Sequence, residues 1–106
     1  MTYEIMTAIL DDLKLPYAYH QFEDKSEIEG ADKYIAYFEF DKNRFLADDI
    51  VYHYEPHFAV ELYTRKKDLS TEQALIRLFD EYEAAWSGGD TVYLDDEKMY
   101  LTVFYV

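Results

Sequence analysis

The sequence contains no cysteine, so it can form neither a disulfide framework nor a thiolate metal site. This absence fits a cytosolic protein. No apolar run approaches the roughly 18 residues that a membrane-spanning helix needs. The segment MTYEIMTAIL also lacks the basic start and long apolar stretch of a signal peptide. We therefore expect a protein that does not enter a membrane and has no covalent cross-links.

Basic residues are also few. Ten lysines and arginines stand against 23 aspartates and glutamates, which gives a formal net charge of −13. Direct binding to nucleic acid through phosphates needs clustered basic groups, so this function is disfavoured. Anionic membrane surfaces are disfavoured for the same reason. The acidity is compatible with ordinary solubility or with a surface that repels or imitates DNA.

Apolar and aromatic residues, by contrast, are abundant. Half of the residues are hydrophobic, 19% are aromatic and 12 are tyrosines, a composition that argues against disorder despite the charge. Tyrosine combines apolar area with a polar hydroxyl, which suits half-buried sheets and interfaces. The length of 106 residues predicts a single domain, residues 1–106, with one modest core.

The first half of the sequence predicts a helix followed by strands. Residues 3–14 place apolar side chains at helical spacing, with Thr2 as the N-cap and Pro16 ending the helix. A short strand, a polar loop and a longer strand are expected over 17–22, 23–33 and 34–40. The alternation in the longer strand predicts that one face carries Tyr34, Ala36, Phe38 and Phe40.

The segment DIVYHYEPHFAVELYTRKKD, residues 49–68, is the most patterned part of the sequence. It follows a charged connection at 41–49 and predicts two strands or one long strand from residue 50. The predicted alternation sets Phe58, Val60 and Leu62 against Ala59, Glu61 and Tyr63. Pro56 cannot donate a hydrogen bond to a neighbouring strand, so we expect an edge position, a bulge or a bend there.

A second helix is predicted over 70–86, with Ser70 and Gln73 forming a capping box and SGGD at 87–90 ending it. Its apolar face would consist of Leu75, Leu78, Phe79, Tyr82 and Trp86. The remaining residues predict a hairpin whose turn is DDEK, followed by a strand that places Met99, Leu101, Val103 and Tyr105 on one face. This order predicts an α+β fold in which two helices pack on a mainly antiparallel sheet.

Patterns that would indicate catalysis or metal binding are weak. His20, His53 and His57 could meet as metal ligands. His53 and His57 are four residues apart, but they flank Pro56 in a strand-like segment rather than on a helix that would aim both imidazoles at one ion, and no HExxH pattern is present. Adjacent carboxylates point apart in regular structure, so they do not form the convergent pair of a hydrolase. No P-loop, GxGxxG or GxSxG segment is present. We expect no catalytic residue, no cofactor and no metal.

Three segments resemble a known family: LPYAYHQF, KYIAYFEFDKNRFLADDIVYHYEPHFAVELYTRKKDLSTEQ and EKMYLTVFYV. They are similar to small prophage proteins of Gram-positive bacteria that lie among the head–tail joining genes of long-tailed phages, next to the major tail protein. Members are commonly identified as tail-terminator or head–tail completion proteins. The resemblance covers most of the chain. Where members often have PYI, this chain has DKYI at 32–35, which affects the expected loop geometry but not the strand.

The resemblance implies a structural subunit and no catalysis. Such a subunit forms a ring, often a hexamer, that caps the tail tube and joins it to the head. Its partners would be copies of itself, the major tail protein and a head-completion protein, with no sequence-specific nucleic acid and no membrane. It would be located in the bacterial host cytoplasm during assembly and then in the virion tail. An acidic lumen would let DNA slide through such a ring without sticking.

A ring needs a heterologous interface whose rotation closes. The 41–49 connection and the basic cluster RKK at 65–67 are the expected sources of that interface, because the basic side chains would meet the acidic surface of a neighbouring subunit. The predicted contact residues are Arg44, Phe45, Leu46, Asp48, Asp49, Arg65, Lys66 and Lys67.

Two other classes of function stay open at this point. In the first, a DNA mimic or inhibitor uses its carboxylates to occupy a basic nucleic-acid-binding partner, with tight and salt-sensitive binding. The abundance of aromatic residues in the predicted sheet argues weakly against this function. In the second, a small enzyme would need a pocket in which histidine and carboxylate groups converge.

Overall fold

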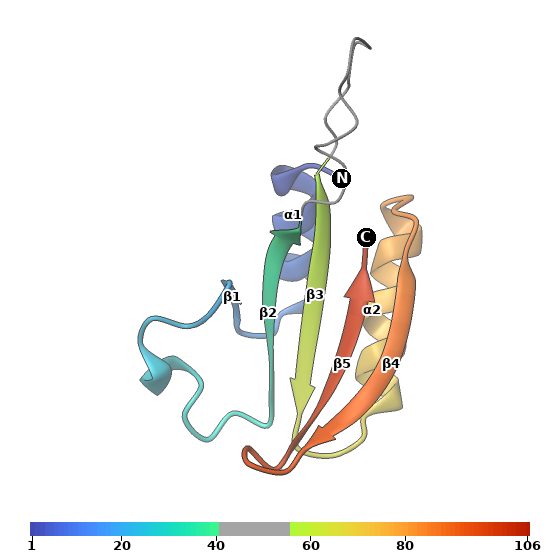
Figure 1. Cartoon of the computed structure of the whole chain (residues 1–106). Coiled ribbons are helices and arrows are strands. Elements are labelled where there is room, and N and C mark those ends of the chain that lie inside the picture. The colour runs from blue at the N-terminus through green and yellow to red at the C-terminus, as the bar shows by residue number, and fades with distance from the viewer. Residues whose placement is uncertain (41–55) are drawn as a thin grey trace, which may run out of the picture.

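The computed structural model describes residues 1–40 and 56–106. Five of the predicted contact residues (Arg44, Phe45, Leu46, Asp48 and Asp49) lie outside the described residues, as do His53 and the strand predicted from residue 50. The elements in order are α1 Tyr3–Leu13, β1 Tyr17–Tyr19, the short 3₁₀ helix η1 Lys25–Glu27, β2 Lys33–Phe40, β3 His57–Thr64, α2 Leu69–Glu81, β4 Ser87–Leu94 and β5 Met99–Tyr105 (Figure 1).

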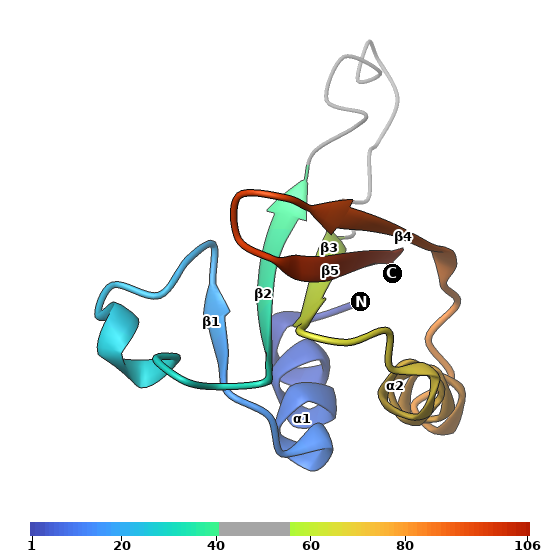
Figure 2. The same cartoon turned by 90° about the horizontal axis from the view of Figure 1, so that it is seen from below.

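The strands form one five-stranded sheet in the order β1-β2-β3-β5-β4. β1 runs parallel to β2, whereas the other neighbouring pairs are antiparallel. Both helices lie on the same side of the sheet, as the view from below shows (Figure 2). The predicted α+β fold, with two helices on a mainly antiparallel sheet, is therefore confirmed.

The first helix forms for the predicted reasons. The Thr2 hydroxyl accepts a hydrogen bond from the backbone N–H of Ile5, which satisfies one of the unpaired donors at the helix start. The helix ends at Leu13, and its C-cap, Lys14, has a φ of 63°. β1 is shorter than predicted and ends at Tyr19, because His20 adopts a φ of 66° that a strand cannot accommodate.

The second helix differs from its prediction at its start. Its N-cap is Asp68, whose Oδ1 accepts the Thr71 N–H at 3.1 Å and whose Oδ2 accepts the Thr71 hydroxyl at 2.7 Å. The predicted capping box is therefore wrong: Ser70 and Gln73 lie inside the helix. The pKa of Asp68 is lowered, first by the hydrogen bond from the Thr71 side chain and then by the backbone N–H. A carboxylate caps this end well because it also faces the positive end of the helix dipole.

The end of α2 was also predicted wrongly. The helix ends at Glu81, and Glu83 takes a left-handed conformation with a φ of 56°. Ala84 N–H donates to the carbonyl of Phe79 at 2.8 Å and Glu83 N–H to that of Asp80 at 3.1 Å, which is a Schellman motif. The SGGD segment instead begins β4, where a β-bulge separates Gly88 from Asp90. Trp86 lies beyond the helix and packs its ring against Phe104.

Glu83 offers a direct test of this helix end. Replacing Glu83 by glycine should raise the free energy of unfolding by about 0.5–1 kcal/mol, because glycine adopts positive φ without the steric cost of a Cβ. The matched control is Glu81→Gly, which removes the same charge inside the helix and should lower stability by about 1 kcal/mol. Urea unfolding of both variants measures the two values. If both substitutions changed the free energy of unfolding in the same direction, the assignment of a Schellman motif would be contradicted.

The core lies between the helices and one face of the sheet. On the sheet side it contains Ile35, Tyr37, Phe58, Val60, Leu62 and Phe104. On the helix side it contains Met6, Ile9, Leu10, Leu75 and Phe79. The alternation predicted for residues 58–63 is confirmed, since Phe58, Val60 and Leu62 are buried against the helices. Burying these large apolar side chains supplies most of the driving force for folding.

Pro56 lies immediately before β3 and outside its ladder. The pairing of β2 with β3 runs without interruption from Phe40↔His57 to Lys33↔Thr64, so the described part of this ladder contains no bulge. The predicted edge position is wrong, because β3 is the central strand of the sheet. A proline at this place interrupts no hydrogen bond of the described ladder, which is why a central strand tolerates it there. The predicted hairpin turn at 95–98 is confirmed by the Leu94↔Met99 pair.

Candidate functional site

Within the described residues, no helix covers the sheet face opposite α1 and α2, and this face is turned toward the viewer in Figure 1. Side chains on a strand alternate between faces, and directly paired residues share a face. Because Phe58, Val60 and Leu62 point to the helices, the register places the intervening residues of β3 and their partners on the other side. We call this surface the open face; its members include Tyr34, Ala36, Phe38, Phe40, Ala59, Glu61, Tyr63, Val92, Leu101, Val103 and Tyr105.

Aromatic rings contact one another across the open face. Tyr34 and Tyr63 stack with their ring centroids 4.9 Å apart and an interplanar angle of 15°. Phe22, from the segment after β1, meets Tyr34 edge-on at 5.7 Å. At the other end of the sheet, Phe40 meets Tyr105 at 5.6 Å. Rings of this kind combine large contact area with few rotatable bonds, which favours their use in protein–protein contacts.

Glu61, on the central strand β3, places a carboxylate in the middle of the open face. Glu61 accepts a hydrogen bond of 3.2 Å from the hydroxyl of Tyr63. Burial, followed by the charge of Glu61 and its hydrogen bond, raises the pKa of Tyr63 well above its usual value. Burial also raises the pKa of Tyr34. Both hydroxyls therefore stay protonated at neutral pH. The Tyr34 hydroxyl can donate a hydrogen bond to a partner, whereas the Tyr63 hydroxyl already donates to Glu61 and can accept one.

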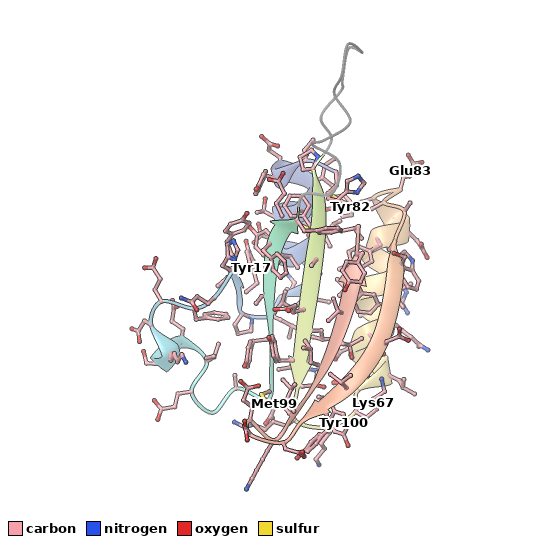
Figure 3. All side chains as sticks on the ribbon, viewed as in Figure 1. Tyr17, Lys67, Tyr82, Glu83, Met99 and Tyr100 are labelled. Carbon is pink, nitrogen blue, oxygen red and sulfur yellow. The ribbon has the colours of Figure 1, made fainter. Side chains whose placement is uncertain are left out.

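A cleft of about 680 Å³ opens at one end of this face, between the segment after β1 and the β4–β5 turn. Its walls include Phe22, Tyr34, Tyr63, Arg65 and Met99, and Figure 3 labels Met99 near the turn. His20, Glu29 and Glu97 also line it, but within the described residues His20 stacks on Phe38 and makes no hydrogen bond to a carboxylate. The lining does not form the acid–base pair that a hydrolase needs.

The basic cluster at 65–67 makes intramolecular contacts. Arg65 Nε donates to the carbonyl of Ala31 and lies 3.5 Å from an Asp32 carboxylate oxygen. Lys67 Nζ donates to Glu72 and to Thr91, at 2.7 Å in each case. Lys66 is exposed and meets no carboxylate in the described part of the chain. Contact of these three residues with a neighbouring subunit stays a prediction, and Lys67 would have to leave an internal network to make it.

The described histidines lie along the sheet. His20 stacks on Phe38 with ring centroids 5.5 Å apart, and His57 tilts against Phe40 at 6.2 Å. Across residues 1–40 and 56–106, no group of three or more histidine, aspartate or glutamate side chains is placed to hold a metal ion. In the same residues, no helix has both the length and the apolar character needed to cross a bilayer.

Apolar residues are exposed around β4, and their exposure was not predicted from the sequence. Val92 is 55% exposed, Tyr93 49% and Tyr105 43%. Because SGGD was predicted to end a helix, the strand before the hairpin turn was predicted over residues 91–94 only. In the structure this strand, β4, extends over eight residues. The alternation of Val92 and Leu94 with Thr91 and Tyr93 was the available signal for an edge strand with apolar residues on both faces.

Comparison with known proteins provides no independent identification. No protein-family model, no curated protein and no solved structure matches the chain.

Proposed function

We propose that this protein is a noncatalytic structural subunit of a long-tailed phage, acting in tail termination or head–tail completion. It assembles with copies of itself into a ring at the end of the tail tube. Its further partners are the major tail protein and a head-completion protein. In this proposal it acts in the host cytoplasm during assembly and then in the virion tail.

The placement of the family-like segments supports this proposal. LPYAYHQF provides β1, and the long central segment provides β2, β3 and the start of α2. EKMYLTVFYV provides β5 and the residues of the turn before it. The segments that carry the resemblance, although far apart in the sequence, therefore meet in four of the five strands of one sheet.

The open face is the observation that carries the proposal. An isolated subunit would leave the half-buried and exposed members of this face, such as Phe38, Val92 and Tyr105, partly in contact with water, whereas a neighbouring subunit can cover them. Exposed apolar surface bordered by polar residues is typical of protein–protein contact sites. By register the open face also carries the carboxylates of Glu61 and Asp90, so contact between copies there must keep these like charges apart.

Deletion of the gene from its prophage tests this function. We expect electron microscopy of induced lysates to show heads and tails that remain separate. Joined virions of normal appearance would overturn the proposal. Purified protein mixed with tail tubes should also appear as a ring at the tube end.

Complementation of the deletion tests the role of the open face. A Tyr105→Glu variant places a charge on this face and should fail to restore joined virions, because a buried carboxylate without a partner opposes subunit contact. Leu69→Glu is the matched control, since Leu69 is 60% exposed at the start of α2. It should restore joining to the wild-type level. If both variants restored joined virions to the same level, the open face would have no role in assembly.

A further inference from the structure

β4 presents an unpaired strand edge. It is the last strand of the sheet and pairs with β5 on its inner side, and no strand in residues 1–40 or 56–106 pairs with its outer side. Such an edge exposes a row of backbone N–H and C=O groups that can pair with another strand. Figure 2 shows β4 at the border of the sheet, beyond β5.

The bulge of β4 lies at Gly88 and Asp90, and the following residues Thr91–Leu94 carry no bulge and no charge that would protect the edge. The sequence of β4, SGGDTVYL, contains neither lysine nor proline. Val92 and Tyr93, on opposite faces of the strand, are 55% and 49% exposed. The other border of the sheet differs, because β1 has three residues and ends at His20, whose φ is 66°. The two borders therefore differ in their capacity for strand addition.

Carboxylates flank the exposed part of this edge. Asp90 precedes Thr91–Leu94, and Asp95, Asp96 and Glu97 follow in the turn; all four are exposed. Glu83 adds a further exposed carboxylate before the strand, and Figure 3 labels it at the end of α2 next to the start of β4. A second copy paired along Thr91–Leu94 would set carboxylate against carboxylate: Asp90 would face Asp90 in a parallel pair and Asp95 in an antiparallel pair centred on this segment. Like charges placed this way repel.

We propose that the outer edge of β4 at Thr91–Leu94 binds an extended segment of a different protein by strand addition. The segment that fits alternates apolar with small β-branched polar side chains. Its apolar side chains share one face and contact Val92, while the side chains between them lie beside Tyr93 on the other face. It carries lysine or arginine at both ends, opposite Asp90 and the turn carboxylates. Backbone hydrogen bonds supply affinity in this mode and side chains supply specificity. The site does not depend on the proposed ring.

Binding of the synthetic peptide acetyl-KKTVTVTKK-amide to the full chain tests this site. In NMR titrations, we expect the largest backbone amide shifts in residues 90–94 and their β5 partners. Because part of the attraction is between exposed charges, raising the salt from 50 to 300 mM should weaken binding several-fold. A peptide with glutamate in place of every lysine should bind at least about tenfold more weakly. Equal binding of the two peptides would overturn the proposal.

A matched pair of variants locates the site. Tyr93→Lys places a repelling charge on the edge and should weaken binding of the lysine peptide at least about tenfold. Leu69→Lys makes the same charge change at a residue of α2 with similar exposure and should stay within about twofold of wild type. Loss of binding in both variants, or in neither, would refute the edge as the site. So would a dimer, detected by sedimentation without peptide, that Tyr93→Lys dissociates.

Discussion

Replacing Phe58 by alanine is expected to lower the free energy of unfolding by about 3–5 kcal/mol, the largest effect of any single substitution considered. Phe58 is fully buried in the central strand. Its ring meets Tyr3 edge-on with centroids 4.8 Å apart and lies 6.0 Å from the ring of Tyr37. Alanine would leave a cavity between α1 and the sheet, and the packed strands on both sides prevent its collapse. Urea unfolding followed by circular dichroism measures the loss.

Phe38→Ala is the control for this prediction, because it makes the same chemical change on the open face. Phe38 is half-buried and contacts the His20 ring. We expect the free energy of unfolding to fall by about 1–2 kcal/mol, because a half-buried side chain loses less buried apolar area on truncation than a fully buried one. The truncation also leaves no enclosed cavity. If the two substitutions cost the same, the open face would be packed as tightly as the helix-covered face. That result would remove the physical basis for treating it as a contact surface.

Replacing Lys67 by methionine is expected to lower stability by about 1–3 kcal/mol. Lys67 Nζ lies 2.7 Å from Glu72 Oε2 and 2.7 Å from Thr91 Oγ1. Thr91 and Thr102 share a further hydrogen bond of 2.7 Å, so the network ties α2 to the β4–β5 hairpin. Figure 3 labels Lys67 where these elements meet. Methionine preserves the apolar stem but leaves the Glu72 carboxylate, whose side chain is 12% exposed, without its cation.

Lys66→Met provides the matched control in the adjacent residue. Lys66 is exposed, and its loss should change stability by less than about 0.5 kcal/mol. The double variant Lys67→Met/Glu72→Gln should be more stable than Lys67→Met alone, because it removes the buried charge that lacks a partner. A double-mutant cycle on these residues gives their coupling free energy. A cost for Lys67→Met no greater than for Lys66→Met would show that the network contributes nothing to stability.

Short-range patterns in the sequence were sufficient to predict much of the fold. The alternation through Phe58, Val60 and Leu62 identified a strand with one buried face, and the spacing through Met6, Ile9 and Leu10 identified the first helix. These predictions succeeded because strand and helix periodicity relate directly to the face that a core must cover. The end of α2 was mispredicted for the complementary reason. A glycine pair is a strong local signal for the end of a helix. Packing of the last helical turn instead ended α2 at Glu81, with Glu83 in a left-handed conformation that glutamate rarely adopts.

The sequence by itself determined that this protein folds as helices on a sheet and carries a large excess of negative charge. Only the tertiary structure decided which sheet face stays uncovered, which border of the sheet is open, and that Lys67 is used inside the molecule. The physical reason is that alternation shows that a strand has two different faces, but not which neighbouring element covers each one. That outcome depends on strand order, on the side chosen by both helices, and on contacts between residues far apart in the chain.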